Sequence, residues 1–137
     1  MKLFVDASLL IYLNIPLPQD AENLVEEFFK GLLVNELYTN ILVLDEVICV
    51  SEKKYKIAKS DTIDFLDNVV IPFINILPLR ELEYFTAKRH IIKYNLNPSD
   101  AIHLATIDNY GLNAIVTEDK DFDRTHVKRL WIDTAQK

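Results

Sequence analysis

The chain has 137 residues, the length of one globular domain with enough residues to bury a core. Apolar residues make up 50% of it and charged residues 26%, a balance that excludes a disordered or fibrous protein. The two glycines cannot build a glycine-rich phosphate loop, and the single cysteine, Cys49, excludes an internal disulfide and a multi-cysteine zinc site.

The net charge of −6 argues at first against a nucleic-acid partner. The acidic excess is local, however, because residues 1–50 carry 2 basic and 8 acidic side chains, whereas residues 51–137 carry 13 of each. Part of this excess fits carboxylates that ligate a metal, whose charge would be offset by the bound cation. Nucleic acid therefore stays open as a partner.

The pattern of the N-terminal residues predicts no signal peptide. The apolar N-terminal stretch is interrupted by Asp6 and lacks the basic start and cleavage site of a signal peptide. No run approaches the roughly 18 apolar residues of a membrane span. We therefore expect a cytoplasmic protein with no membrane partner.

The first half of the chain alternates short apolar runs with helical patterns. We predict a strand at 2–5, an amphipathic helix at 20–36, a strand at 37–39 and a helix through 42–55. Asn40 is expected to cap the second of these helices, because its side chain accepts a hydrogen bond from an unpaired amide.

The second half continues the alternation. We predict a helix from Ser60 or Asp61 to Val70, a strand at 73–77, helices at 81–94 and 97–111, and strands at 114–116 and 130–132. Asn97 followed by Pro98 is typical of a helix start, and Gly111 of a helix end.

This order of elements predicts the fold class. Strands that alternate with helices form a parallel sheet through right-handed crossovers, which gives an α/β sandwich. No repeat, low-complexity tract or linker interrupts the chain, so we predict a single domain over residues 1–137.

Two acidic residues follow predicted strands. Asp6 comes after the first strand, and Asp119 after the strand at 114–116. Ligands of open α/β sheets bind beyond the carboxyl ends of the strands, so both positions suit a functional site. The alternative for Asp119 is a solvated loop, because it lies in a run of charged residues.

Two further acids lie on predicted helices. Glu46 is surrounded by apolar residues, where an unpaired carboxylate is costly and a divalent cation is a suitable partner. The alternative is a solvated stripe that it shares with Asp45. Asp100 occupies the third position of its helix, where a carboxylate stabilises the exposed amides without any other role. The two roles of Asp100 are compatible.

Four carboxylates in one cleft repel one another unless cations lie between them. Oxygen ligands suit Mg²⁺ and Mn²⁺, and such ions support hydrolysis of phosphodiesters by a metal-activated water. The residue types allow this chemistry without requiring it.

Four segments in order resemble a known family. They are VDAS at 5–8, LVLDEV at 42–47, NPSDAIHLATI at 97–107 and IVTEDKDFD at 115–123. Together they resemble PIN-domain nucleases, specifically the VapC type of toxin–antitoxin ribonuclease. The resemblance covers essentially the whole chain and implies that the catalytic and metal-binding residues are Asp6, Glu46, Asp100 and Asp119.

The resemblance also carries expectations beyond these acids. It implies a PIN-like three-layer α/β/α sandwich with a mostly parallel sheet, and an RNA endonuclease that depends on Mg²⁺ or Mn²⁺. It further implies a VapB-like antitoxin as partner and a homodimer.

Several neighbours of the acids are candidates for supporting roles. Ser8 and Thr117 resemble residues that orient carboxylates or waters, although Ser8 also fits the cap of a short helix from Leu9. Asp121 is either a fifth acid of the site or a solvated residue. His103, one turn after Asp100, is a possible metal ligand or a structural histidine, and the family's all-oxygen ligand set favours the latter.

RNA binding requires cations near the acids. Basic clusters are available at 53–59, which includes Lys54, at 88–93 and at 120–129. The last lies nearest to the acids in the sequence and is favoured for this contact: Lys120, Arg124, Lys128 and Arg129. Ordinary surface solvation explains the cluster equally well.

Three other functions fit parts of the pattern. An RNA-processing nuclease without an antitoxin would use the same site, and a non-catalytic RNA-binding module would share the fold. A phosphoacceptor receiver domain also places Asp residues at strand ends, but it needs an adjacent acidic pair after the first strand, where only Asp6 is present.

Overall fold

A computed structural model describes residues 1–135 of the chain. In chain order the elements are β1 (Lys2–Val5), α1 (Ala7–Asn14), α2 (Gln19–Leu32), β2 (Glu36–Asn40), α3 (Ile41–Tyr55), α4 (Lys59–Phe65), the π-helical turn η1 (Leu66–Val70), β3 (Asn75–Leu77), α5 (Glu81–Tyr94), α6 (Pro98–Tyr110), β4 (Ala114–Val116), the 3₁₀ turn η2 (Lys120–Arg124), β5 (Lys128–Leu130) and α7 (Ile132–Ala135).

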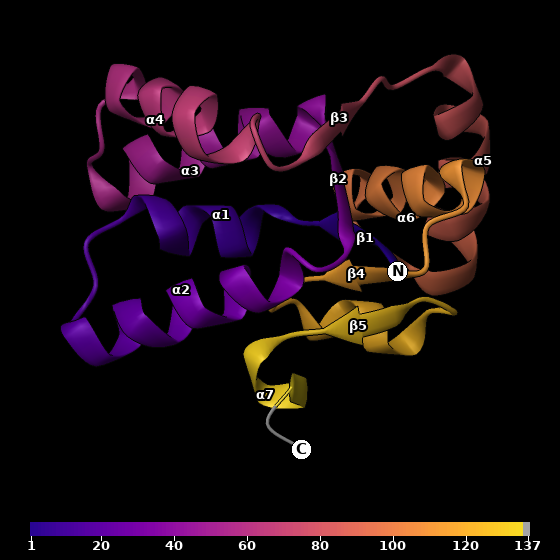
Figure 1. The fold of residues 1–137 in the computed structure, drawn as a ribbon. Helices are drawn as coiled ribbons and strands as arrows, with labels where there is room; N and C mark the ends of the chain where they lie inside the picture. The colour runs from indigo at the N-terminus through magenta and orange to yellow at the C-terminus, as the bar shows by residue number, and fades with distance from the viewer. Residues whose placement is uncertain (136–137) are drawn as a thin grey trace.

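The strands form one sheet in the order β3-β2-β1-β4-β5, and all neighbouring strands are parallel. Helices α1 to α4 lie on one side of the sheet, and α5 and α6 lie on the other (Figure 1). Right-handed crossovers require this division, because the chain moves outward from β1 to β3 and then returns to β4. The predicted three-layer α/β/α sandwich is therefore confirmed, with a sheet that is parallel throughout.

The central strands supply the middle of the core. Every residue of β4 and the last three residues of β1 are buried. Helices cover both faces of a parallel sheet, so its inner strands are continuous apolar runs rather than alternating ones. Because all strands run the same way, their carboxyl ends meet at one edge, which is where Asp6 and Asp119 follow β1 and β4.

Local signals explain where the helices next to this edge begin and end. The Asn40 side chain accepts a hydrogen bond from the Val43 amide at 3.1 Å and caps α3. Pro98 begins α6, and Gly111 ends it with a φ of 67°, a conformation that glycine adopts without strain. Asn97 stands at the cap position, but its side chain makes no capping hydrogen bond.

The structure differs from the predicted elements in several places. The helix predicted at 20–36 is Gln19–Leu32, because Glu36 begins β2, and the helix predicted up to Val70 ends at Phe65 and continues as the π-helical turn η1. The strand predicted at 73–77 is limited to Asn75–Leu77, because the backbone after η1 turns through Ile74. The last strand is Lys128–Leu130 rather than 130–132, because the chain turns at Trp131. The Trp131 amide donates a hydrogen bond to the Thr134 hydroxyl instead of to a neighbouring strand. The first helix begins at Ala7 and is capped by Asp6, not by Ser8.

Within the part of the chain that the structure describes, none of the helices combines the length and apolar character needed to span a bilayer.

Candidate active site

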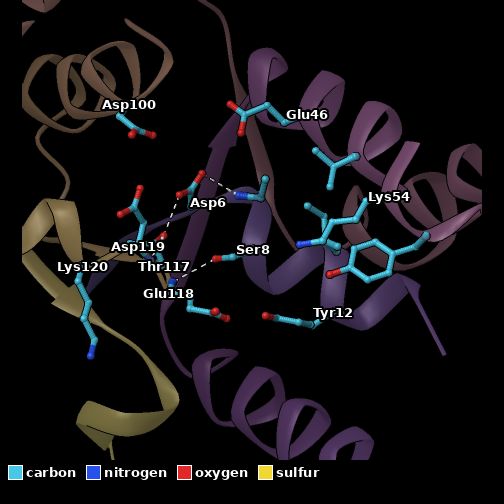
Figure 2. Close-up of a pocket in the computed structure, with 14 residues that line it drawn as sticks. Asp6, Ser8, Tyr12, Glu46, Lys54, Asp100, Thr117, Glu118, Asp119 and Lys120 are labelled. Carbon is cyan, nitrogen blue, oxygen red and sulfur yellow. Dashed lines mark hydrogen bonds between the residues drawn. The ribbon is translucent and has the colours of Figure 1, made fainter. Parts of the chain in front are cut away.

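The four predicted acids line one cleft of about 490 Å³ at the carboxyl edge of the sheet (Figure 2). Asp6 follows β1 and Asp119 follows β4, whereas Glu46 projects from α3 and Asp100 from the first turn of α6. Segments that are up to 113 residues apart in the sequence (Asp6 to Asp119) thus meet in one place.

Asp6 is the most firmly held of the four, with only 7% of its surface exposed. One carboxylate oxygen accepts a hydrogen bond from the Ala7 amide at 2.8 Å, and the other accepts one from the Thr117 hydroxyl at 2.8 Å. Each oxygen keeps a further lone pair, so the carboxylate can still ligate a cation.

Thr117 and Ser8 tie the ends of the strands together. The Thr117 hydroxyl donates to Asp6 and accepts a hydrogen bond from the Asp119 amide at 3.1 Å, so it links two of the acids. The Ser8 hydroxyl oxygen accepts from the Glu118 amide at 3.1 Å and holds α1 against the segment after β4. Thr117 thus contacts the candidate metal ligand Asp6 directly, whereas Ser8 contacts the backbone of Glu118, next to the candidate ligand Asp119.

Asp119 and Asp121 lie together on one side of the cleft. The Asp119 carboxylate accepts a hydrogen bond from the Asp121 amide at 2.9 Å. One carboxylate oxygen from each of Asp100, Asp119 and Asp121 lies within 4.8 Å of the others. Asp121 is the outermost of the three, since its side chain is 54% exposed and pairs with Arg124 at 3.1 Å.

Glu46 is held by a buried histidine. The Nε2 atom of His103 lies 2.8 Å from a Glu46 carboxylate oxygen and 3.7 Å from an Asp6 oxygen. His103 is completely buried, and its ring packs against Phe4. This contact explains how Glu46 can occupy a largely apolar helix surface.

The hydrogen bonds of Asn40 settle where the His103 ring carries its proton. The Asn40 carbonyl oxygen is taken by the Val43 amide, so the Asn40 amide nitrogen faces His103 Nδ1 at 3.2 Å and donates to it. With Nδ1 as acceptor, the neutral ring carries its proton on Nε2 and donates it to Glu46. His103 therefore positions Glu46 in this arrangement and does not present a free lone pair to a metal.

Burial and the neighbouring carboxylates raise the affinity of Asp100 for a proton. Burial is the largest cause of a raised pKa for Asp100, and the charges of Asp6 and Asp119 add to it, so that its pKa rises to about 7. A bound divalent cation would relieve this repulsion. The surrounding donor set consists of carboxylate oxygens, which fits Mg²⁺ or Mn²⁺.

The cleft is also lined by Tyr12 and Glu118, which the sequence did not single out, and by Lys54. The Tyr12 hydroxyl faces the Glu118 carboxylate (Figure 2), and this interaction is the main cause that raises the pKa of Tyr12 to about 12. The Lys54 amino group lies 5.4 Å from the centre of the Tyr55 ring and brings a positive charge to the cleft. Lys54 belongs to the basic cluster at 53–59 and lies at the end of α3, the helix that carries Glu46.

The basic residues predicted to contact RNA are dispersed, and only Lys120 lines the cleft. The Arg129 side chain is 5% exposed, and its guanidinium pairs with the Asp123 carboxylate at 2.8 Å. Arg124 donates to the Tyr94 and Asn95 carbonyls. Lys128 begins β5 opposite Ala114, at the edge of the sheet away from the acids.

Solved structures with a similar fold include toxins of toxin–antitoxin systems. VapC20 of Mycobacterium tuberculosis, titled a sarcin-ricin loop cleaving toxin, aligns with a TM-score of 0.73 and 14% identity over 91% of this chain and 95% of that one. DNA-bound VapBC of Salmonella typhimurium aligns with a TM-score of 0.72 and 16% identity over 96% of this chain and 98% of that one. A toxin–antitoxin complex of Klebsiella pneumoniae aligns with a TM-score of 0.65 and 20% identity over 92% of this chain and 93% of that one. At these identities, the likeness shows a shared fold.

A comparison with curated protein sequences found no match. The family model described as the PIN domain matches residues 3–128, a range that includes all four acids of the cleft. The chain therefore belongs to the PIN-domain family.

Proposed function

We propose that this protein is an endoribonuclease that uses Mg²⁺ or Mn²⁺ to hydrolyse phosphodiester bonds, and that it acts in the cytoplasm as the toxin of a toxin–antitoxin pair. The observation that carries the proposal is the meeting of Asp6, Glu46, Asp100 and Asp119 in one cleft. Membership of the PIN-domain family supports the same chemistry.

The four carboxylates would hold the ion or ions, with Asp6 fixed by Thr117 and Glu46 fixed by His103. A bound divalent cation lowers the pKa of a water molecule and stabilises the charge on the leaving oxygen. With a pKa of about 7, Asp100 loses its proton near neutral pH and so becomes available as a ligand.

Lys54 and Lys120 are the basic residues that line the cleft, and they would contact the RNA backbone. They lie on α3 and at the start of η2, and thus come from two separate segments around the acids. The proposal therefore replaces a contiguous basic segment with two cations brought together by the fold.

The toxin role draws on the neighbours, whose titles name toxin–antitoxin complexes. We propose a VapB-like antitoxin and a second copy of this chain as protein partners. Apolar side chains on α5 stay exposed and provide surface for such a partner: Leu82, Tyr84, Phe85 and Ile92.

The test is cleavage of a mixed RNA pool by the purified protein with Mg²⁺, with Mn²⁺ and with EDTA. Asp6→Asn and Asp119→Asn are compared with Asp64→Asn, which neutralises an exposed acid on α4 away from the cleft. We expect metal-dependent cleavage that is lost in the two cleft variants and retained in the control. Equal cleavage by all variants would place the activity elsewhere or in a contaminant, and no cleavage with either metal would count against the nuclease.

A further inference from the structure

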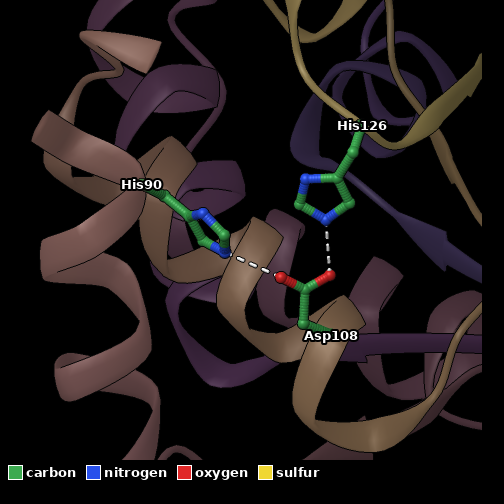
Figure 3. Close-up of side chains that lie close together, drawn as sticks. All are labelled: His90, Asp108 and His126. Carbon is green, nitrogen blue, oxygen red and sulfur yellow. Dashed lines mark hydrogen bonds and ion pairs between the residues drawn. The ribbon is translucent and has the colours of Figure 1, made fainter. Parts of the chain in front are cut away.

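A second group of metal-ligating side chains lies outside the cleft. It combines His90 of α5, Asp108 of α6 and His126 of the segment between η2 and β5 (Figure 3). Asp108 lies eight residues after Asp100 on α6, which separates the two places by about 12 Å along the helix axis. The group therefore does not share ligands with the acidic cleft.

The two imidazoles converge on one carboxylate. The Nε2 atoms of His90 and His126 each lie 2.7 Å from a different oxygen of Asp108. One ligand atom from each of the three residues lies within 4.8 Å of the others. In a tetrahedral zinc site with bonds of about 2.0–2.1 Å, ligand atoms are separated by about 3.3 Å, so small side-chain shifts suffice to admit an ion.

We propose that His90, Asp108 and His126 form a binding site for a borderline transition-metal ion, of which Zn²⁺ is the representative. Two imidazole nitrogens and one carboxylate oxygen suit Zn²⁺, whereas the all-carboxylate cleft suits Mg²⁺ or Mn²⁺. The ion takes the place of the protons that the two Nε2 atoms now donate to Asp108.

Tyr94 provides the supporting contact that such a site needs. Its hydroxyl lies 2.8 Å from Nδ1 of His126. When Nε2 binds the ion, the ring proton resides on Nδ1, and the Tyr94 oxygen accepts it. The Tyr94 ring also stacks on His90, with ring centres 5.8 Å apart, so one residue orients both imidazoles.

The site is closed on one side and open on the other. The His90 side chain is 11% exposed, that of Asp108 29% and that of His126 46%. Solvent thus reaches the ligand atoms from the His126 side, which supplies an entry path and leaves room for water as a fourth ligand.

An ion bound there would fasten the segment after η2 to helices α5 and α6. Arg124, the last residue of η2, already donates to the Tyr94 and Asn95 carbonyls. The η2 turn follows directly on Asp119, and α6 carries Asp100, so the ion would stabilise the half of the fold that holds two of the cleft acids.

The test is a titration of the EDTA-stripped, dialysed full chain with Zn²⁺ in excess Mg²⁺, followed by calorimetry and by thermal unfolding. Variants His126→Gln and Tyr94→Phe probe the new site, and Asp100→Asn serves as the matched change in the cleft. The His126→Gln and Tyr94→Phe variants are expected to fold, because both substitutions change side chains that are at least partly exposed.

We expect one Zn²⁺ to bind and to raise the melting temperature of the wild type and of Asp100→Asn. The affinity for Zn²⁺ should fall at least about 10-fold in Tyr94→Phe, because His126 loses the hydroxyl that orients its ring. It should fall further in His126→Gln, because the ion loses one of its ligands. No Zn²⁺ binding to the wild type would overturn the proposal, and so would binding that His126→Gln leaves unchanged. Binding lost only in Asp100→Asn would assign the zinc to the cleft instead. None of these outcomes depends on RNA cleavage.

Discussion

Neutralising Asp100 should make the metal-free protein more stable. The pKa of this carboxyl is raised from 3.8 to about 7, chiefly by burial and then by the charges of Asp6 and Asp119. Because the pKa of Asp100 is higher in the folded state than in the unfolded state, the folded state is destabilised wherever only the unfolded chain ionises this carboxyl. The stability is therefore fully present below pH 3.8 and is lost as the pH rises to about 7. Above that pH the folded chain bears the cost of an ionised Asp100, and Asp100→Asn removes this cost.

The size of the expected gain in stability follows from the difference between the two pKa values of Asp100. About three pKa units correspond to no more than about 4 kcal/mol, and solvent screening of a partly exposed carboxyl reduces this to about 1–2 kcal/mol. The variant also loses a charge at the third position of α6, which costs about 0.5 kcal/mol through the helix dipole. We therefore expect a net gain of about 1 kcal/mol, or about 3–5 °C in melting temperature.

Thermal unfolding followed by circular dichroism measures this gain at pH 8 and pH 5 with EDTA. The matched control is Asp61→Asn, which removes a carboxylate from the third position of α4, outside the acidic cleft. The gain should be smaller at pH 5 than at pH 8, absent in the control, and reduced by Mg²⁺, which stabilises only the wild type. A lower melting temperature for Asp100→Asn at pH 8 would refute the reasoning that the carboxylates repel one another.

Three further substitutions probe the surroundings of the acids. Thr117→Val should lower cleavage about 10–100-fold while Thr117→Ser retains it, as measured by single-turnover rates, because the hydroxyl holds a candidate ligand. Asn40→Ala should destabilise the protein by about 2–4 kcal/mol in urea unfolding, since α3 loses its cap and His103 loses a buried partner; a loss below about 0.5 kcal/mol would contradict this network. Lys54→Ala should weaken RNA binding and lower the salt slope by about one, whereas Lys128→Ala should change neither; equal effects would argue against the cleft as the RNA site.

The sequence predicted the parts of the site that the backbone alone decides. In a parallel sheet the carboxyl ends of the strands share an edge, so the meeting of Asp6 and Asp119 followed from two short apolar runs. The start of α3 at Asn40 and the end of α6 at Gly111 followed from capping chemistry, which acts within a few residues. Glu46 stood out because its neighbours on the helix are apolar.

Contacts between side chains that are distant in the sequence could not be predicted in this way. Asn40 and His103 are 63 residues apart, and only the packing of α6 against the end of β2 lets the amide fix the tautomer of the ring. His90 and His126 each lie 18 residues from Asp108, which is far wider than the spacing of about two to five residues between paired ligands in short zinc motifs. The contacts of Arg129 are a further example, because Asp123 and the Thr117 carbonyl accept hydrogen bonds from its guanidinium.

The position of a bound ion tests the central claim most directly. Anomalous diffraction from a crystal grown with Mn²⁺ locates the ion without any assumption about the RNA target. We predict a manganese peak between the carboxylates of Asp6, Asp100 and Asp119, and its absence from crystals of Asp6→Asn. A crystal with no manganese in this cleft, or with the ion bound only elsewhere on the molecule, would contradict the assignment of these acids as a catalytic metal centre.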